Sequence, residues 1–352
     1  MATWGRFPRG MPTEPLVIAH RGASGHRPEH TLAAYRLAIR QGADYIEPDL
    51  VPTRDGHLVA RHENEISGTT DVADRPELAD RRTTKVVAGH EVTGWFTEDL
   101  TLAELKTLRA KERLPHLRPE NTRYDGLLEV PTFDEVLELV HWETRRTGRR
   151  IGVDPETKHP THFAALGLRV EPLLVGTLQR HGLDDAQAPV MVQSFETASL
   201  QELATLTRVP LVQLLDVAGA PYDLVAAGDP RSYDALATPA GLAGIAGYAT
   251  AIGAHKDRVL PRHPSSGDLG RASTLVADAR AAGLLVHVWT LRAENQFLAT
   301  RFRNGTDPGA RGDAHAEVRA FLDAGVDGIF TDHPGTACRA VEDWQAVAHV
   351  SA

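Results

Sequence analysis

Cysteine is nearly absent from the chain. Cys338 is the only cysteine among 352 residues. Because a disulfide needs two cysteines and cysteine-type zinc sites need several thiolates, both are excluded within one chain. The fold therefore depends on packing, and a hydrophobic content of 42% supplies enough apolar side chains for a sizeable core.

Long apolar runs are missing as well. No stretch approaches the length of a membrane-spanning helix, so no membrane span is expected. Residues 1–15 contain Arg6 and Arg9 but no apolar segment of the length that a signal peptide needs. The sequence as written predicts a cytoplasmic protein, or a periplasmic or secreted one if a leader has been removed. No feature of the sequence indicates the oligomeric state.

The chain also lacks an excess of positive charge. It has 38 Lys and Arg residues against 47 Asp and Glu residues, a formal net charge of −9 at pH 7. Cationic side chains that neutralise phosphates dominate the affinity of proteins for nucleic acid. Nucleic acid is therefore disfavoured as a partner, and a small-molecule substrate is expected.

Short apolar runs recur along the chain and alternate with segments of helical spacing. The expected strands are residues 16–20, 45–50, 151–155, 190–195, 211–215, 245–252, 285–291 and 328–331. The expected helices include residues 31–41, 132–147, 197–207 and 272–282, with Gly42 and Gly283 at two helix ends. Eight strands alternating with helices predict an α/β fold, a (β/α)8 TIM barrel.

An open, doubly wound sheet would give a similar pattern. Its usual nucleotide fingerprint is a glycine-rich turn after the first strand. Here that turn, residues 20–25, carries His20 and Arg21 where such a turn has glycine. The barrel is the better interpretation.

A long irregular segment follows the second expected strand. From about residue 63 to residue 130 the sequence is polar, and it offers one expected helix at residues 102–108. We expect a single barrel domain over residues 14–345, with this segment inserted over one end. A second irregular stretch, residues 304–313, is expected to form a loop at the same end.

Charged residues cluster where the expected strands end. In a parallel barrel these ends meet at one face, where the active sites of this architecture lie. We therefore expect separate segments to contribute to one pocket. The residues concerned are His20, Arg21, Glu47, Asp49, His62, Glu156 and Lys158.

Three acidic residues could bind one metal ion. Glu47 and Asp49 are two positions apart, so their side chains leave an extended strand on the same side. Glu156, at the end of another strand, is a third candidate. Because all three offer oxygen, a divalent cation such as Ca²⁺ or Mg²⁺ is predicted, with Mn²⁺ also allowed. The alternative is that acids at strand ends only cap those strands.

Histidines and cations complete the expected pocket. His20 and His62 lack the spacing of a zinc site, so they are interpreted as a proton donor and acceptor. The alternative is that each is a buried hydrogen-bonding residue. Arg21 and Lys158 are suited to a phosphate, or else they balance the nearby carboxylates.

The order of motifs along the chain resembles the glycerophosphodiester phosphodiesterase family. The resemblance covers nearly the whole chain and is closest to the long, periplasmic-type branch. It rests on His62 and on residues 17–25, 28–31, 42–44, 47–49, 53–56, 70–75, 155–158, 192–195, 211–214, 287–290 and 328–332.

The resemblance implies a metal-dependent enzyme that hydrolyses glycerophosphodiesters to sn-glycerol 3-phosphate and an alcohol. The matching positions give His20 and His62 as the acid and base, without deciding which is which. They give Arg21, Lys158, Phe195 and Trp289 as phosphate or substrate contacts, and Glu47, Asp49 and Glu156 as ligands of one divalent cation.

Two further residues, Glu63 and His287, lie close to expected site residues in the sequence. Glu63 stands where the family usually has Asp directly after the second histidine, so a role for this carboxylate as a ligand, or in orienting one, is in doubt. His287 lies on the same strand face as Trp289 and is expected deeper in the barrel, as a structural residue.

Three other functions agree less well with the sequence. A lysophospholipase D-like or sphingomyelinase D-like enzyme would expose apolar surface near the pocket, and the charged residues 75–82 give little sign of it. A catalytically silent ligand-binding barrel would have lost one of His20, Glu47, Asp49 or His62, and all four are present. A sugar isomerase would not require an adjacent His and Arg pair.

Overall fold

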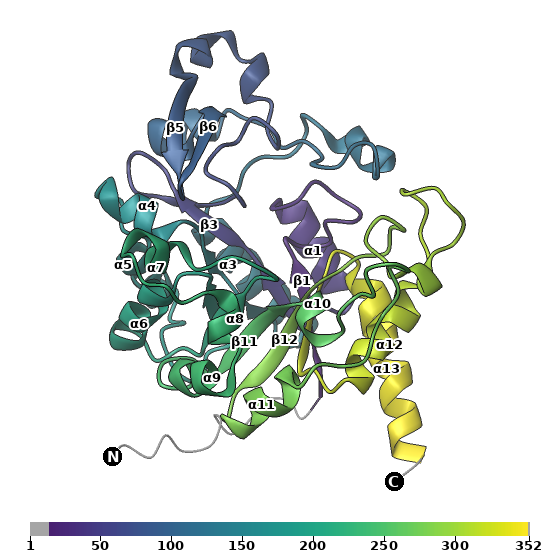
Figure 1. Ribbon diagram of the computed structural model, residues 1–352. Coiled ribbons are helices and arrows are strands. Elements are labelled where there is room, and N and C mark those ends of the chain that lie inside the picture. The colour runs from purple at the N-terminus through teal and green to yellow at the C-terminus, as the bar shows by residue number, and fades with distance from the viewer. Residues whose placement is uncertain (1–13, 351–352) are drawn as a thin grey trace.

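A curled, mainly parallel sheet forms the centre of the protein. The computed structural model describes residues 14–350 (Figure 1). Its strands are β1 (Leu16–His20), β2 (Tyr45–Glu47), β3 (Asp49–Pro52), β7 (Gly152–Val153), β8 (Glu156–Thr157), β9 (Val192–Ser194), β10 (Leu211–Leu215), β11 (Ala251–His255), β12 (Leu285–Leu291) and β13 (Gly328–Thr331).

Parallel pairing runs around the whole sheet and closes it. β1 pairs with β13 on one side and with β2 on the other. The second barrel strand consists of β2 and β3, and the third consists of β7 and β8, because β2 pairs with β7 and β3 pairs with β8. β8 pairs with β9, and the order then continues through β10, β11 and β12 to β13. The predicted (β/α)8 barrel is confirmed.

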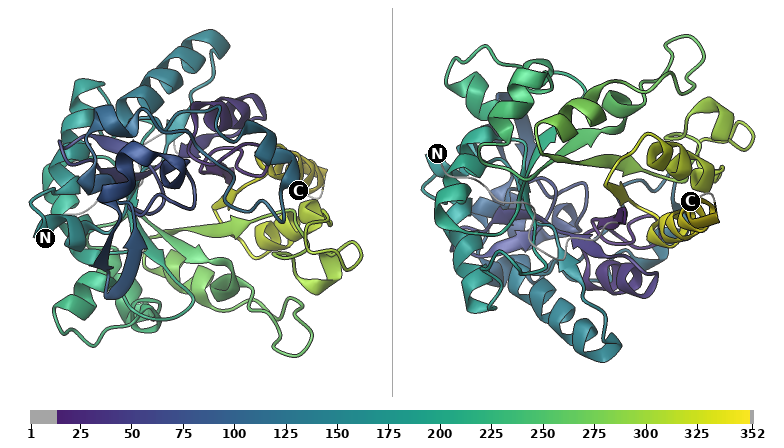
Figure 2. Two further views of the ribbon diagram at one scale, coloured as in Figure 1. Left: turned by 90° about the horizontal axis from the view of Figure 1, so that it is seen from above. Right: turned by 90° about the horizontal axis from the view of Figure 1, so that it is seen from below.

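Helices surround the barrel (Figure 2). The helices predicted at residues 31–41, 132–147, 197–207 and 272–282 are confirmed as α1 (Leu32–Arg40), α3 (Phe133–Thr147), α6 (Thr197–Leu206) and α11 (Leu275–Ala281). The others are α2 (Leu102–Leu105), α4 (Pro160–Ala165), α5 (Val170–Arg180), α7 (Tyr222–Ala226), α8 (Tyr233–Leu236), α9 (Pro239–Ile245), α10 (Lys256–Val259), α12 (Ala314–Asp323) and α13 (Pro334–Val350).

Local sequence explains where the long helix α3 begins and ends. The Thr132 hydroxyl accepts a hydrogen bond from the Glu135 N–H, and the Glu135 carboxylate accepts one from the Thr132 N–H. This reciprocal arrangement satisfies backbone donors that have no partner within the helix. Gly148 ends the helix at φ +70°, a conformation that glycine adopts without a steric penalty.

The predicted bounds of one strand are wrong. Residues 245–252 were expected to form a strand, but Ile245 is the last residue of α9 and β11 begins only at Ala251. Thr238 caps α9 and Pro239 occupies its first position, which starts a helix early in this segment. Leu242 and Ile245 are both buried at helical spacing. The apolar run therefore joins the end of a helix to the start of a strand.

The segment inserted after the second barrel strand contains a hairpin that the sequence did not predict. β5 (Thr83–Val87) pairs antiparallel with β6 (His90–Gly94), and the hairpin stands above the barrel in Figure 1. Ala88 and Gly89 make its two-residue turn at φ +48° and φ +81°. The only α-helix in this segment, α2, ends at Leu105, three residues earlier than predicted.

A small core of its own stabilises the insertion. It is formed by buried side chains of Ile66, Val72, Leu78, Trp95, Leu100 and Leu108. The Trp95 indole N–H donates to the Leu78 carbonyl at 2.7 Å, so this large aromatic side chain is both packed and hydrogen-bonded. The insertion is therefore a folded structure that rests on the barrel.

The described helices show no candidate for a membrane span. Within residues 14–350, none combines the length and hydropathy that crossing a bilayer requires. Residues 1–13, which cover most of the segment where no signal-peptide pattern was found, lie outside the described part of the chain.

His287 is a buried histidine in the interior of the barrel. Its side chain is fully buried, and neither ring nitrogen has a hydrogen-bond partner. Burial lowers the pKa of His287 from its usual 6.5 to about 4, because the low-dielectric interior disfavours the imidazolium. It does not line the cavity described below.

This burial makes stability depend on pH. In the unfolded chain His287 gains a proton below pH 6.5, whereas in the folded protein it does so only near pH 4. Its contribution to stability is therefore complete above pH 6.5 and is lost as the pH falls toward 4, by about 3 kcal/mol in total. We expect urea unfolding of the His287→Leu variant to show a correspondingly weaker loss of stability between pH 7 and pH 4. Parallel curves for both proteins would contradict this.

Candidate active site

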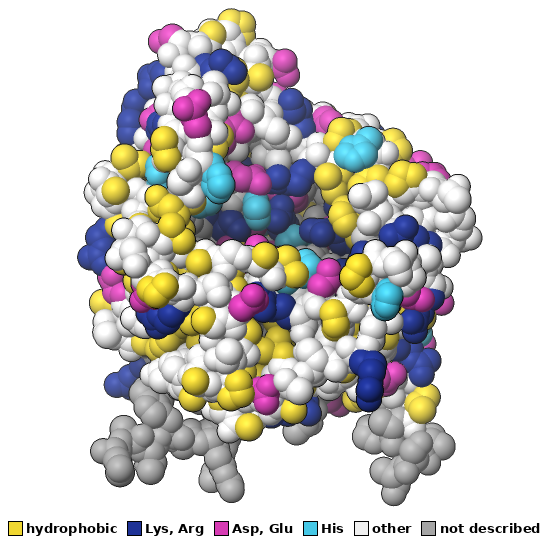
Figure 3. All heavy atoms as spheres, viewed as in Figure 1, with side chains coloured by type: hydrophobic (Ala, Val, Ile, Leu, Met, Phe, Trp, Pro, Cys, Tyr) yellow, Lys and Arg dark blue, Asp and Glu magenta, His cyan; other side chains and the backbone are white. Residues whose placement is uncertain are grey.

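A cavity opens at the barrel end that the insertion overhangs. Figure 3 shows a hollow there, with cationic, acidic and histidine side chains inside it. Its volume is about 270 Å³. Among its lining residues are His20, Arg21, Glu47, His62, Glu156, Lys158, Phe195 and Trp289. Every predicted site residue except Asp49 thus lines one cavity, and Asp49 is fully buried beside Glu47 and Glu156.

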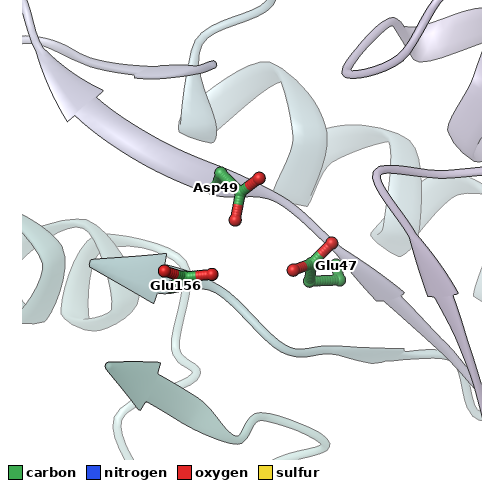
Figure 4. A group of neighbouring side chains, drawn as sticks. All are labelled: Glu47, Asp49 and Glu156. Atoms are coloured by element: carbon green, nitrogen blue, oxygen red, sulfur yellow. The ribbon is translucent and has the colours of Figure 1, made fainter. Parts of the chain in front are cut away.

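Glu47, Asp49 and Glu156 form a compact group, called here the acidic trio (Figure 4). Each offers an oxygen, and these oxygens all lie within 4.8 Å of one another. The register of the sheet produces this closeness, because Asp49 of β3 lies opposite Glu156 of β8. Pro48 separates β2 from β3, so Glu47 ends one short strand and Asp49 starts the next.

The electrostatics of the acidic trio suit a bound cation. Burial and the neighbouring Asp49 and Glu156 raise the pKa of Glu47 well above its usual value. Burial likewise raises the pKa of Glu156 to about 8, with Lys158 opposing the shift and Asp49 adding to it. These shifts reflect carboxylates that repel one another away from water. Asp49 also has a buried Oδ1 atom without a hydrogen-bond partner. Three buried oxygen ligands that a divalent cation would satisfy thus fit a metal site.

Asp49 is the member of the acidic trio whose pKa is lowered instead of raised. Burial alone would raise its pKa, but Lys158 and His30 hold the pKa of Asp49 well below its usual range. The His30 ring nitrogen Nε2 lies 2.8 Å from Asp49 Oδ2. His30 is itself held by the Tyr35 hydroxyl at 2.7 Å. A buried partner therefore fixes Oδ2 of Asp49, while Oδ1 has no hydrogen-bond partner.

Arg21 and Lys158 contact the carboxylates of the site and line the same cavity. The Arg21 backbone N–H donates to Glu47 Oε2 at 2.8 Å, while its guanidinium lies 3.1 Å from Glu29 Oε2. The Lys158 ammonium lies 2.7 Å from Glu156 Oε1 and 3.8 Å from Asp49 Oδ1. Of the two roles left open by the sequence, pairing with carboxylates is present. Because both residues also line the cavity, they remain available to an anion there.

His20 is held from one side of its ring. Its Nδ1 atom lies 2.6 Å from Asp332 Oδ1, which leaves Nε2 as the nitrogen that can exchange a proton with a molecule in the cavity. Burial and the charge of Arg21 lower the pKa of His20 to about 4. Its imidazole is therefore neutral at pH 7.

His62 has a similar arrangement on another element. Its Nδ1 atom lies 2.6 Å from Glu63 Oε1, and burial together with Arg21 and Lys158 lowers the pKa of His62 to about 3. The Glu63 carboxylate binds this ring and Arg113, and it is not part of the acidic trio. Glu63 therefore binds the neighbouring histidine and an arginine of the insertion.

The route that brings His62 to the site differs from the prediction. We expected His62 to close an extended segment, residues 56–61, that ends at the same face as the parallel strands. The strand in this segment, β4 (Leu58–Ala60), instead runs antiparallel to β3. The chain leaves the barrel along β3, turns, and returns along β4. A hairpin therefore places His62 beside the strand ends, with the Arg61 N–H donating to the Asp49 carbonyl at 2.9 Å.

Aromatic rings form one wall of the cavity. The rings of Phe195 and Trp289 meet edge to face with centroids 5.6 Å apart, and His255 packs against Trp289 at 4.9 Å. The Trp289 indole N–H donates to the Gly253 carbonyl at 2.9 Å, which fixes the ring. This wall gives the cavity a rigid apolar side.

Several residues that shape the site were not assigned roles from the sequence. Gln193 donates to Glu47 Oε1 at 3.1 Å, and Asp332 holds His20. Both stand in motifs that carried the family resemblance, so their positions were visible but their contacts were not. Arg113 and Arg118 lie in the insertion, where no pattern distinguished them from other arginines.

The barrel, the acidic trio and the adjacent cations define an enzyme site suited to a phosphorylated small molecule. Residues 20–336 match the glycerophosphoryl diester phosphodiesterase family. A glycerophosphodiester phosphodiesterase of Arabidopsis thaliana is 35% identical over 337 residues, covering 92% of this chain and 85% of the plant protein. One from Haemophilus influenzae is 26% identical, covering 93% and 89%. The chain therefore belongs to the glycerophosphoryl diester phosphodiesterase family and is a phosphoric diester hydrolase.

Solved structures share the fold. The glycerophosphodiester phosphodiesterase of Agrobacterium tumefaciens superimposes with a TM-score of 0.56 at 21% identity, covering 92% of this chain and 98% of that one. A phosphodiesterase of Oleispira antarctica, in complex with the product sn-glycerol-3-phosphate, gives a TM-score of 0.60 at 21% identity, covering 94% and 97%.

Proposed function

We propose that this protein hydrolyses glycerophosphodiesters to sn-glycerol 3-phosphate and an alcohol, with His20 and His62 as the acid–base pair. The observation that carries the proposal is that both histidines line the cavity that contains Glu47 and Glu156. Each histidine has its Nδ1 atom bound to a carboxylate, so each has one nitrogen left for proton transfer. The product in the Oleispira antarctica structure supports this choice of substrate.

The residues around the cavity have different roles in the proposed reaction. Arg21 and Lys158 bind the phosphate oxygens and offset the charge that builds on them during hydrolysis. One histidine accepts a proton from the nucleophile, and the other donates a proton to the departing alkoxide. The bound phosphodiester is itself an anion, so it offsets the charges of Arg21 and Lys158 that depress the pKa of His62. Substrate binding therefore makes protonation of this ring easier.

One divalent cation, Ca²⁺, Mg²⁺ or Mn²⁺, would be held by Glu47, Asp49 and Glu156. When bound, it supplies Lewis-acid stabilisation of the phosphoryl oxygens. The all-oxygen set and the unpartnered Asp49 Oδ1 support a hard cation. The aromatic wall of Phe195 and Trp289 offers an apolar surface for the carbon skeleton of the substrate.

A direct assay tests the proposed reaction. We expect release of sn-glycerol 3-phosphate from at least one of glycerophosphocholine, glycerophosphoethanolamine and glycerophosphoglycerol, in the presence of Ca²⁺ or Mg²⁺, measured with a coupled glycerol-3-phosphate dehydrogenase. Lysophosphatidylcholine serves as the comparison. Cleavage of the lysolipid, with no release from any of the three glycerophosphodiesters, would replace this proposal with a lipid phosphodiesterase.

A further inference from the structure

We propose that Arg113 and Arg118, both from the insertion, are positioning residues that fix the two carboxylates orienting His62 and His20. The inference rests on the proposed acid–base function of these histidines. It gives the insertion a part in the chemistry. Neither arginine lines the cavity, so each would act through the carboxylate that it binds.

On the His20 side, Arg118 holds Asp332. The two oxygens of Asp332 have separate partners, because Oδ1 binds the His20 ring while Oδ2 accepts from Arg118 Nη2 at 2.5 Å. Arg292 donates to the same Oδ2 atom at 2.7 Å. The carboxylate is thus tied at one oxygen and can hold the imidazole with the other.

Arg118 is itself fixed at several points. Its Nε donates to Glu294 Oε1 at 2.6 Å, and its Nη1 donates to the Ser24 carbonyl at 3.0 Å. Its side chain is only 6% exposed. A planar guanidinium with three buried acceptors has little freedom to move, so it can serve as a rigid support for Asp332.

On the His62 side, Arg113 holds Glu63 by both of its carboxylate oxygens. Nη1 and Nη2 donate to the two Glu63 oxygens at 2.8 and 2.6 Å, the two-pronged geometry that an arginine makes with a carboxylate. Arg113 Nε and Nη2 also bind the Glu29 carboxylate, each at 2.7 Å. Glu29 in turn contacts Arg21. Arg113 therefore connects the support of one histidine to that of a phosphate-facing cation.

The segment that carries the two arginines, residues 112–121, is held by contacts of its own. The Glu112 carboxylate accepts from the Leu114 N–H at 2.8 Å and from Asn121 Nδ2 at 2.9 Å. Asn121 Nδ2 also lies 3.3 Å from the Ser24 carbonyl, which Arg118 binds too. A single short segment of the insertion thus reaches both histidines from outside the cavity, through the same order of arginine, carboxylate and imidazole.

A double-mutant cycle on the His20 side tests the inference. Kinetics of the full-length metal-loaded protein are compared for Arg118→Met, Asp332→Asn and the double variant. We expect kcat to fall about 100-fold for Asp332→Asn, because a small misplacement of a catalytic group has an effect of that size. Arg118→Met should lower kcat about 10-fold, because Arg292 keeps one hydrogen bond. KM should hardly change in either.

The double variant separates positioning from a general structural effect. If Arg118 acts through Asp332, the double variant should be no slower than Asp332→Asn alone, because the carboxylate that Arg118 positions is already absent from Asp332→Asn. Arg75→Gln is the matched control, because Arg75 is an insertion arginine that donates to Asp71 and the Thr107 carbonyl and to neither Glu63 nor Asp332. Its kcat should equal that of the unchanged protein. Independent, multiplying losses in the double variant, or an effect on KM alone, would overturn the inference.

Further measurements separate a loss of positioning from a loss of folding and from failure of the proposed function. Thermal unfolding checks each variant. Arg118→Lys and Arg113→Lys are measured in every case, so both arginine positions are tested even if Arg118→Met does not fold. The lysine variants keep the charge but lose the fork, so we expect a partial loss of kcat, and full activity would overturn the inference. His20→Ala is measured in the same series. If it retains full activity, the proposed function fails; if it is inactive while both arginine positions are indifferent, only this inference fails.

Discussion

The His20→Ala variant is expected to hydrolyse glycerophosphodiesters with a kcat lower by about 100-fold or more, and His62→Ala should show a loss of the same order. The reason is that each ring lines the cavity with one nitrogen already fixed by a carboxylate. Removing either ring leaves the reaction without a group that moves a proton. Steady-state kinetics with glycerophosphocholine, or with whichever headgroup is cleaved fastest, measure the change.

The matched control for the histidine variants is His57→Ala. His57 is an exposed histidine in the turn between β3 and β4, close in sequence to His62 but outside the cavity lining. Its replacement should leave kcat unchanged. Cation binding should persist in His20→Ala and His62→Ala, because neither ring belongs to the acidic trio. Near-normal turnover in one of these variants would remove that residue from the mechanism.

Removal of divalent cations is expected to abolish nearly all activity. Treatment with EDTA followed by dialysis should reduce hydrolysis by about 1,000-fold or more, because a bound cation stabilises phosphoryl charge by several kcal/mol. Adding back Ca²⁺, Mg²⁺ or Mn²⁺ in separate titrations should restore the rate and identify the preferred ion. Hydrolysis that is undiminished after chelation would exclude a metal-dependent reaction.

A variant of the acidic trio ties this loss to the proposed site. In Glu156→Gln one of the three charged oxygen ligands becomes a neutral amide, so a higher cation concentration should be needed for half-maximal reactivation. Glu120→Gln is the control, because Glu120 is highly exposed in the insertion and lies outside the acidic trio. An identical cation requirement in Glu156→Gln and the unchanged protein would mean that the cation binds elsewhere.

The parts of the site that the sequence predicted share one property. They follow directly from periodic secondary structure. Glu47 and Asp49 come at the end of an apolar run, and strands that end at one face of a barrel bring such residues together. The register that places Asp49 opposite Glu156 is the same pairing that closes the sheet. The strand pairing that forms the barrel therefore also brings the carboxylates of the site together.

The parts that the sequence did not predict depend on the path of the connecting segments. His62 reaches the cavity on a returning hairpin strand, whose antiparallel pairing had not been predicted. The hairpin of β5 and β6 was missed because polar, solvent-facing strands lack a strong apolar alternation. The bounds predicted for the strand at residues 245–252 were wrong for a different reason. One apolar run there spans both the end of a helix and the start of a strand.

By itself, the amino-acid sequence predicted an α/β barrel with acids, histidines and cations gathered at one end, and a set of candidate metal ligands made of oxygen atoms alone. Only the tertiary structure decided which side chains are hydrogen-bonded to the histidines and carboxylates of the site. Asp332 supports His20 across 312 positions of sequence, and Arg113 reaches Glu63 across 50. Hydrogen bonds of this kind join the ends of separate loops and strands, and no periodic pattern along the chain encodes such a meeting.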